Sequence, residues 1–589
     1  MILLVPILVF AAFLVICALM TVGEPLNPTR PLVSFDQSRA YAHRLQKLIA
    51  CETVFQEGEF DQLPFRQLHD QMQELFPNVH RYARSQIAGD GCWVYILPGK
   101  NTERNILLLA HHDVASAEGK WKYPPFSGEI ADGKIWGRGT VNNKTNLFAI
   151  FSAMEELLSE GFCPECNVWV VSSHNTEAGG DGAALAADFF RQQGITFDFV
   201  LDQGEAVADP PISAMNCSKC AMIAFQEKGT HKMILTADAG TNHGGALRAT
   251  PTERMADFIS EIRREGIFIR RMTPELETML KAMAPYTAFS LKLELANLWL
   301  FKGLLVKQLP NISREASELL GTTCSFNNLV TRADGKRCTA RIVLRSMDSG
   351  DLKTDLTRMR TLATKYGIRV ESAGENAVPK ASNPQSPALA KVTRCIHEIF
   401  PDVPVIPFVL PEATDARFFA DLSDCVLRFS PLRLTAQQIM GARGDDENVD
   451  IVAIGTAVIF YRRVLESYTS GNLLEDLDDE DLDDEQWEEE QEPVISSEEI
   501  PAEETIHLTD DFSMELSEDY KSHEFLEEPL LEDLLNAHPE EAEDPVLEEI
   551  TDFDMEDVSE KLLEEYPEEM LEDISDFDIS TLTNWEEYI

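Results

Sequence analysis

Histidines and carboxylates stand where three apolar segments of the chain end, in NILLLAHHD, NVWVVSSHNTEAGG and FDFVLDQGEA. Imidazoles and carboxylates are the side chains with which proteins bind zinc and related ions. Three such segment ends together favour a metal site, whereas a single His or Asp in a loop would not. The candidate residues are His111, His112, Asp113, His174, Glu177 and Asp202.

The segments that carry these residues read as strands of one sheet. Each is a continuous apolar run, and the stretch TNLFAIFSAMEELLSEG between the first two has helical periodicity and ends at a glycine. Apolar strands that alternate with helices predict an α/β fold with a mostly parallel sheet buried on both faces. In such sheets ligands collect at the carboxyl ends of the strands, where the candidates stand.

The charge of the chain is very unevenly distributed. The 589 residues carry a net charge of −51, and 48 acidic but only 2 basic residues lie between Gly471 and Ile589. The remaining body is nearly neutral, which argues against nucleic acid as a partner because phosphate binding needs clustered Lys and Arg. We expect residues 471–589 to be a disordered acidic tail. Its two I-[ST]-D-F-D sequences make it either a solubilising segment or a set of docking motifs for an unknown protein partner.

The N-terminus carries an uncharged apolar run from Ile2 to Val22. About 20 apolar residues can span a bilayer, and a cleaved signal peptide would have basic residues before the run. We therefore expect a single-pass membrane anchor and linker over residues 1–33. The basic residues that follow the run favour a cytoplasmic body.

The chain has eleven cysteines, an odd number without a regular spacing. Two CxxC pairs stand out, Cys163/Cys166 and Cys217/Cys220. The four thiols could hold a structural zinc ion, form redox pairs or simply be packed in the core, and the spacing leaves these alternatives open.

Longer phrases of the sequence carry a resemblance to a known family. AHHDV, WKYPPFSGEIADGKIWGRGTVNNK, EAGGDGA, LDQGEAV and EKGTHKMILTADAGTNHGG are similar to the acetylornithine deacetylase / succinyl-diaminopimelate desuccinylase / aminoacylase / carboxypeptidase family of dinuclear zinc exopeptidases. ANLWLFKGLL, TDARFF, LRFSP and VIFYRRVLESY extend the resemblance to most of the chain between Ser34 and Tyr468.

The resemblance implies a catalytic α/β domain interrupted by a smaller lid, a four-stranded sheet with two helices through which the family often forms homodimers. The expected parts are a catalytic domain at 34–228 and 375–470 and an inserted α+β lid at 229–374. The family hydrolyses N-acyl amino acids or short peptides with two zinc ions and a glutamate base.

Five residues of the family's site are retained in this chain. His111 matches a zinc ligand and Asp113 the carboxylate that supports it, at the i and i+2 positions that share one face of a strand. Asp202 matches a ligand of the same metal, and Glu177 a ligand of the other. His243 matches the lid histidine that reaches toward the substrate.

Three further site positions are degenerate. Asn142 replaces the aspartate that bridges both metals, and a neutral amide is a poor bridge between two dications. Thr176 replaces the general base, and its hydroxyl cannot accept a proton from water near neutral pH. Arg443 replaces a terminal metal histidine, and a guanidinium has no lone pair to offer.

Two functions follow as hypotheses. One is a binding or regulatory pseudoenzyme with at most one weakly bound zinc ion. The other is an active hydrolase of N-acyl amino acids or peptides, with an atypical one-metal site in which His112, His174 or water has taken over a lost role; the unaltered family chemistry would need two zincs.

The pseudoenzyme hypothesis makes a geometric prediction. A buried Glu177 needs a cation, and the planar fork of Arg443 can pair with it through two hydrogen bonds. The alternative is that Arg443 points to solvent and pairs with Asp445 or Asp446.

Overall fold

The computed structural model describes most of the chain up to residue 469. The described residues are 4–56, 58, 60–212, 214–239, 249–312, 318–376 and 378–469. His243 and the acidic tail lie outside them, so the expectations made for both stay untested.

A nine-stranded mixed sheet forms the centre of the fold, with the order β1-β2-β6-β3-β7-β15-β9-β14 and β8 beside β9. The expected mostly parallel sheet is found at its centre, where β6, β3, β7 and β15 run parallel to one another, while β1 and β2 add antiparallel strands at one edge. The strands are β1 (Arg84–Ala88), β2 (Cys92–Leu97), β3 (Asn101–His111), β6 (Cys166–Ser173), β7 (Phe199–Asp202), β8 (Val207–Ala208), β9 (Cys220–Glu227), β14 (Val405–Leu410) and β15 (Val426–Arg428).

Both faces of this sheet are buried, as the apolar strands predicted. Along β3, Ile106 and Leu108 pack into one hydrophobic cluster, whereas Leu107 and Leu109 pack into a second cluster. This alternation is the two-residue period of a strand. It explains why the strand has no polar residue between Asn105 and the histidines at its end.

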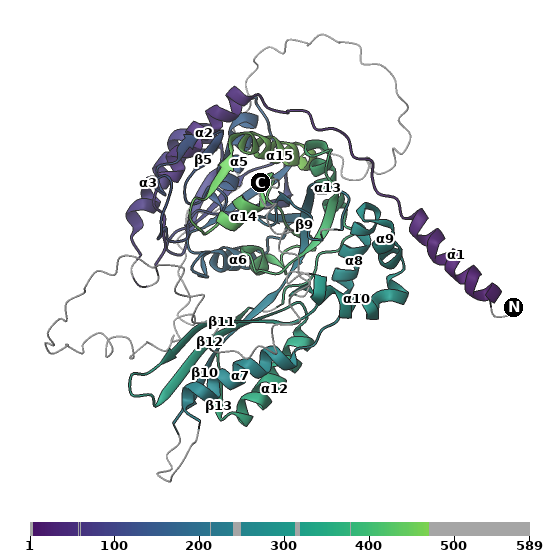
Figure 1. Ribbon diagram of the computed structural model, residues 1–589. Coiled ribbons are helices and arrows are strands. Elements are labelled where there is room, and N and C mark those ends of the chain that lie inside the picture. Colours follow the sequence, from purple (N-terminus) through teal and green to yellow (C-terminus); the bar gives the residue numbers. More distant parts are fainter. Residues whose placement is uncertain are drawn as a thin grey trace, which may run out of the picture. The chain divides into compact units, whose positions relative to one another are not determined.

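Helices cover the two faces. α2, α5, α13 and α15 lie together on one face, and α6 packs on the other (Figure 1). Their bounds, with those of the nearby helices, are α2 (Phe35–Ile49), α3 (Gln62–Leu75), α4 (Pro77–Tyr82), α5 (Lys144–Ser159), α6 (Gly182–Gln193), α13 (Pro387–Ile399), α14 (Ala436–Gly441), α15 (Ile451–Thr469) and the 3₁₀ helix η2 (Asp415–Phe419).

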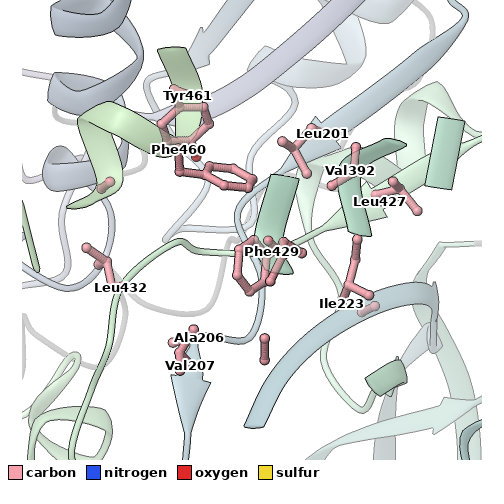
Figure 2. Packing of buried hydrophobic residues seen from close by; sticks show 14 of the residues in the cluster. Leu201, Ala206, Val207, Ile223, Val392, Leu427, Phe429, Leu432, Phe460 and Tyr461 are labelled. Carbon is pink, nitrogen blue, oxygen red and sulfur yellow. The ribbon is translucent and has the colours of Figure 1, made fainter. Parts of the chain in front are cut away.

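The hydrophobic cluster that includes Ile106 and Leu108 also packs against the strands that carry the site. Figure 2 shows Leu201 of β7 and Leu427 of β15 near Val392 of α13 and Phe460 of α15. Phe429 meets the ring of Phe460 edge-on, with 5.4 Å between ring centroids. This packing holds the carboxyl ends of β7 and β15 in place.

A second, four-stranded antiparallel sheet has the order β11-β12-β10-β13 and is covered by α7 and α12 (Figure 1). These strands and helices are the elements that the resemblance implied for a lid, although its expected boundaries stay a prediction. They are β10 (Gly229–Asp238), α7 (Pro251–Glu265), β11 (Thr323–Thr331), β12 (Arg337–Ser346), α12 (Ser349–Lys365) and β13 (Ile368–Asn376).

Between α7 and β11 the described residues form further helices. They are α8 (Pro274–Met283), α9 (Phe289–Ala296) and α10 (Leu298–Ile312), with the 3₁₀ turn η1 (Ala284–Tyr286). α8 packs against β14 of the central sheet rather than against the four-stranded sheet. A small sheet of β16 (Asn448–Asp450), β5 (Lys134–Trp136) and β4 (Glu129–Ala131) completes the described strands.

The apolar N-terminal run forms α1, Leu4–Met20, which contacts α9. Among the residues that the structure describes, no helix has both the length and the apolar character needed to cross a membrane. The expected transmembrane helix is therefore not supported. All eleven cysteines are free, so the two CxxC pairs form no disulfides.

Candidate functional site

The candidate residues come from the carboxyl ends of β3, β6 and β7 and from three loops that meet them. Asp113 organises the first of these ends. It is fully buried, with Oδ1 3.1 Å from His111 Nδ1 and Oδ2 accepting a 2.8 Å hydrogen bond from the Glu177 backbone N–H. Burial opposes protonation of His111, but the hydrogen bond and charge of Asp113 outweigh it and raise the pKa of His111 to about 10. The imidazole is therefore a cation at neutral pH.

Asn142 connects this histidine to Glu177. Its Oδ1 lies 3.0 Å from His111 Nε2, and its Nδ2 donates a 2.8 Å hydrogen bond to Glu177 Oε1. A protonated His111 donates and the amide oxygen accepts, so both ends of the amide are satisfied. The residue at the family's bridging position thus joins two side chains directly.

Arg443 reaches Glu177 from the far side of the site. Its Nε donates to Glu177 Oε2 at 2.8 Å and its Nη2 to Oε1 at 3.0 Å, a two-point ion pair. The predicted Glu177–Arg443 pair is confirmed. The alternative partners are engaged elsewhere, since Asp445 and Asp446 accept hydrogen bonds from the backbone of Lys120 and Lys122.

The two partners differ in exposure. The Glu177 side chain is only 9% exposed, while that of Arg443 is 52% exposed and also lies 3.4 Å from Glu412. Burial alone would raise the pKa of Glu177, but the charges of His111 and Arg443 hold it below its ordinary value. Charged-group hydrogen bonds of this two-point geometry are among the stronger ones in proteins.

A buried ion pair fixes the loops from which Asn142 and Arg443 project. Glu447 accepts hydrogen bonds from the backbone N–H of Val141 at 2.7 Å and of Asn142 at 3.0 Å, and pairs with Arg138 at 2.8 Å. Arg138 in turn donates to the Arg443 carbonyl at 3.3 Å. Arg443 has a left-handed φ of 65°, which residues with side chains seldom adopt. The contact with Arg138 helps to hold it there.

Thr176, at the family's general-base position, has a buried carboxylate as its partner. Thr176 Oγ1 donates a hydrogen bond to Asp415 Oδ2, and Asp415 is buried at the start of η2. Burial raises the pKa of Asp415, although the charge of Arg417 opposes this. Asp415 belongs to the TDARFF phrase of the family resemblance, and that phrase is the sequence signal that could have identified it.

Asp202 does not join the His111 end of the site through its carboxylate. Its Oδ1 accepts from the Gln203 backbone at 2.8 Å and its Oδ2 from Ala416 at 2.9 Å. Burial, followed by the nearby charge of Asp415, raises the pKa of Asp202 to about 7. Each oxygen of Asp202 thus has a backbone partner, and the expected weak zinc ion at His111 and Asp202 stays a prediction.

The two other histidines are packed among aromatic rings. His112 stacks on Trp93 with centroids 3.9 Å apart and lies 2.8 Å from Ser172 Oγ, while His174 contacts the rings of Phe55 and Phe60. Burial lowers the pKa of both imidazoles, so they are neutral. These surroundings support a packing role for them.

The donor set does not fit the two zinc ions that the family chemistry uses. Both nitrogens of His111 and both oxygens of Glu177 are taken by protein partners, and the terminal position offers a guanidinium. Within the described ranges, no group of three or more His, Cys, Asp or Glu side chains could hold a metal ion. The four thiols of the two CxxC pairs therefore do not come together as a zinc site among the described residues.

Solved structures share this fold, a mixed α/β domain with a second, four-stranded sheet. An M20 family metallo-carboxypeptidase from Sulfolobus solfataricus aligns with a TM-score of 0.54 at 18% identity, over 73% of this chain and 99% of that one. Human carnosine dipeptidase 1 aligns with a TM-score of 0.53 at 14% identity, over 74% of this chain and all of that one.

Residues 107–467 match the model of peptidase family M20/M25/M40, and the chain belongs to this family. An N-fatty-acyl-amino acid synthase/hydrolase, PM20D1, of Xenopus tropicalis is 28% identical, over 73% of this chain and 86% of its own length. A probable carboxypeptidase S-like 2 of Dictyostelium discoideum is 27% identical, over 72% and 84% respectively.

Proposed function

We propose that this chain is a catalytically inactive or strongly impaired member of the M20 family that binds N-acyl amino acids or short peptides without hydrolysing them efficiently. The observation that carries the proposal is the two-point ion pair between Glu177 and Arg443. It occupies both oxygens of a carboxylate that the family would use for a metal, and it places a guanidinium where a ligand histidine would stand.

The charges along the site alternate in a way that needs no metal. Asp113, His111, Glu177 and Arg443 follow one another as anion, cation, anion and cation, with Asn142 between His111 and Glu177. A carboxylate that is buried without a cation is costly, so this pairing stabilises the site as it stands. The lost base alone lowers the rate by on the order of a hundredfold or more.

The ligand class is supported by the relatives. One is named as an N-fatty-acyl-amino acid synthase/hydrolase and another as a probable carboxypeptidase S-like protein, so we take N-acyl amino acids and short peptides as the ligand class. The competing function, an active one-zinc hydrolase, is favoured by the retained His111–Asp113 pair. A zinc ion on His111 Nε2 would first have to displace Asn142.

Metal content and turnover, measured together on the full chain, test the proposal. We expect substoichiometric zinc by plasma mass spectrometry, and binding but no efficient hydrolysis of N-dodecanoylglycine or alanylglycine. The triple variant Asn142→Asp, Thr176→Glu, Arg443→His should gain zinc, while the control Asp445→Asn should not. Efficient turnover by the unmodified chain that Glu177→Ala abolishes would overturn the proposal and leave the one-zinc hydrolase.

A further inference from the structure

The exposed apolar side chains of the described residues collect on α1, α9 and α10. More than half of the large apolar residues that lie exposed in the described ranges belong to these three helices. Soluble proteins seldom expose large contiguous apolar patches, and such patches mark sites of interaction with another molecule. These helices are therefore the part of the described surface where an apolar partner is expected.

α1 is apolar around its whole circumference. No charged residue lies between Leu4 and Met20. Successive residues of an α-helix point about 100° apart, and the four consecutive residues Ile7, Leu8, Val9 and Phe10 are 44–64% exposed. A protein partner would cover one face of such a helix, whereas lipid chains can surround all of its exposed faces. The distribution of these side chains favours lipid as the partner.

A narrow strip attaches α1 to the rest of the protein. Leu14 and Ala18, one helical turn apart, are its buried residues. Asn297, at the end of α9, donates from Nδ2 to the Leu14 carbonyl at 3.0 Å. After α1, Glu24 Oε2 lies 2.7 Å from His397 Nε2. The helix therefore lies against the protein along one strip and leaves its other faces exposed.

The exposed face of α10 continues the apolar surface of α1. Trp299, Leu300 and Leu304 share one face of α10 and are 64%, 43% and 44% exposed. The ring of Phe10 meets the Trp299 ring edge-on, with 6.1 Å between the ring centroids. An indole combines an apolar body with one polar N–H, and tryptophan is enriched where membranes meet water. The two helices thus present one continuous apolar surface.

The attachment of α1 near its middle determines how it can meet a membrane. Its 17 residues span about 26 Å, against a hydrocarbon core of about 30 Å. If α1 crossed that core, Asn297 and the nearby Glu294 of α9 would enter it with Leu14, and polar or charged groups are costly there. If α1 lies in the plane of the interface, its apolar faces reach the acyl chains and α9 stays among the headgroups.

We propose that α1 and the exposed face of α10 form one surface that lies on a phospholipid membrane, with α1 in the plane of the interface. Burial of apolar side chains among acyl chains supplies the binding free energy. The proposal concerns where the protein resides. It does not depend on which ligand the site at Glu177 and Arg443 binds.

Flotation of the full chain with phosphatidylcholine vesicles tests the proposal. These vesicles are uncharged overall, so they do not repel a chain with a net charge of −51. The unmodified chain should float with the vesicles. The double variant Trp299→Glu, Leu304→Glu should lower the partition coefficient at least about tenfold, because two apolar side chains are replaced by charged ones. Leu8→Glu, Phe13→Glu on α1 should have an effect of similar size.

The matched control is Leu329→Glu, Val330→Glu, which changes two residues of β11 that are 51% and 53% exposed. It should alter the partition coefficient by less than about twofold, since β11 is not part of the proposed surface. Melting temperatures check that each variant is folded. Unchanged flotation of either the α1 variant or the α10 variant would overturn the joint surface.

Tryptophan fluorescence gives a second measurement that does not depend on a disruptive variant. Vesicles with brominated acyl chains should quench the fluorescence of the unmodified chain, because Trp299 lies against them. Trp299→Phe keeps an apolar ring and should still float, but it should lose most of this quenching. Equal quenching of the two proteins would place Trp299 outside the membrane and overturn the proposal.

Two further outcomes would replace the proposed arrangement with another. Alkaline carbonate should release the unmodified chain from the vesicles, and its retention would show that α1 spans the bilayer. A chain that does not float, but self-associates in sedimentation velocity until Trp299→Glu, Leu304→Glu dissociates it, would show that a second copy rather than lipid covers the surface.

Discussion

Arg443 donates two parallel hydrogen bonds to Glu177 although 266 residues separate them in the chain. The pair joins the loop after β6 to the loop after α14, and Asn142 extends it to His111. The side chains at these family site positions therefore pair with one another.

Arg443→Met should lower the free energy of unfolding by about 1–3 kcal/mol, because Glu177 loses both charged hydrogen bonds while staying buried. Urea denaturation monitored by fluorescence measures the change. The control Glu412→Gln alters an exposed partner of the same guanidinium and should change stability by less than about 0.5 kcal/mol. Equal effects of the two variants would contradict the pairing.

Asn142→Asp should destabilise the chain without metal and stabilise it with zinc. The new carboxylate can still accept from His111 Nε2, but it replaces the amide N–H that Glu177 Oε1 accepts at 2.8 Å with a second negative charge, and like charges so close repel each other. Thermal unfolding with chelator and with zinc chloride measures both effects. The unmodified chain should show no comparable zinc shift, and a decrease in melting temperature on adding zinc to the variant would count against the idea.

Glu447→Gln should cost about 3–5 kcal/mol, because it leaves Arg138 buried without its anion. Glu447 also receives two backbone N–H groups from the loop that carries Asn142. Hydrogen exchange should therefore accelerate at Val141 and Asn142 before the core opens. Asp445→Asn, on the same loop but exposed, is the control and should leave exchange at these amides unchanged.

The buried Lys228 should make the folded chain more stable as the pH rises in alkaline solution. Burial lowers its pKa from 10.5 to about 8 in the folded chain. Between these values the unfolded chain binds the proton and the folded chain does not, so stability rises with pH in this window. The free energy of unfolding of the unmodified chain, minus that of Lys228→Met, should therefore increase by on the order of 2–3 kcal/mol from pH 8 to 10.5. Lys232→Met, at an exposed position of β10 four residues after Lys228, should show no such growth, and a falling difference would contradict the burial argument.

Much of the fold could be predicted from local sequence pattern. The continuous apolar run before His111 predicts a strand buried on both faces, and its residues do alternate between two hydrophobic clusters. The membrane anchor predicted from Ile2–Val22 rests on the same kind of local pattern, and among the described residues no helix is long and apolar enough to cross a membrane.

For the candidate site, too, the sequence determines some features and the tertiary structure others. The sequence by itself determined that the chain has the strand-end residues of the M20 family and lacks a carboxylate at Asn142, a base at Thr176 and a histidine at Arg443. These facts are local, since each depends on one phrase and its neighbours.

Only the tertiary structure decided what the altered residues do. Asp202 accepts hydrogen bonds from the backbone of Gln203 and Ala416, and Thr176 donates to Asp415. The α8–α10 helices line a cavity beside Pro411. Apart from the contact of Asp202 with its neighbour Gln203, these contacts join segments far apart in the chain. Their geometry follows from how the sheet and its loops pack together, and no local period or spacing encodes that packing.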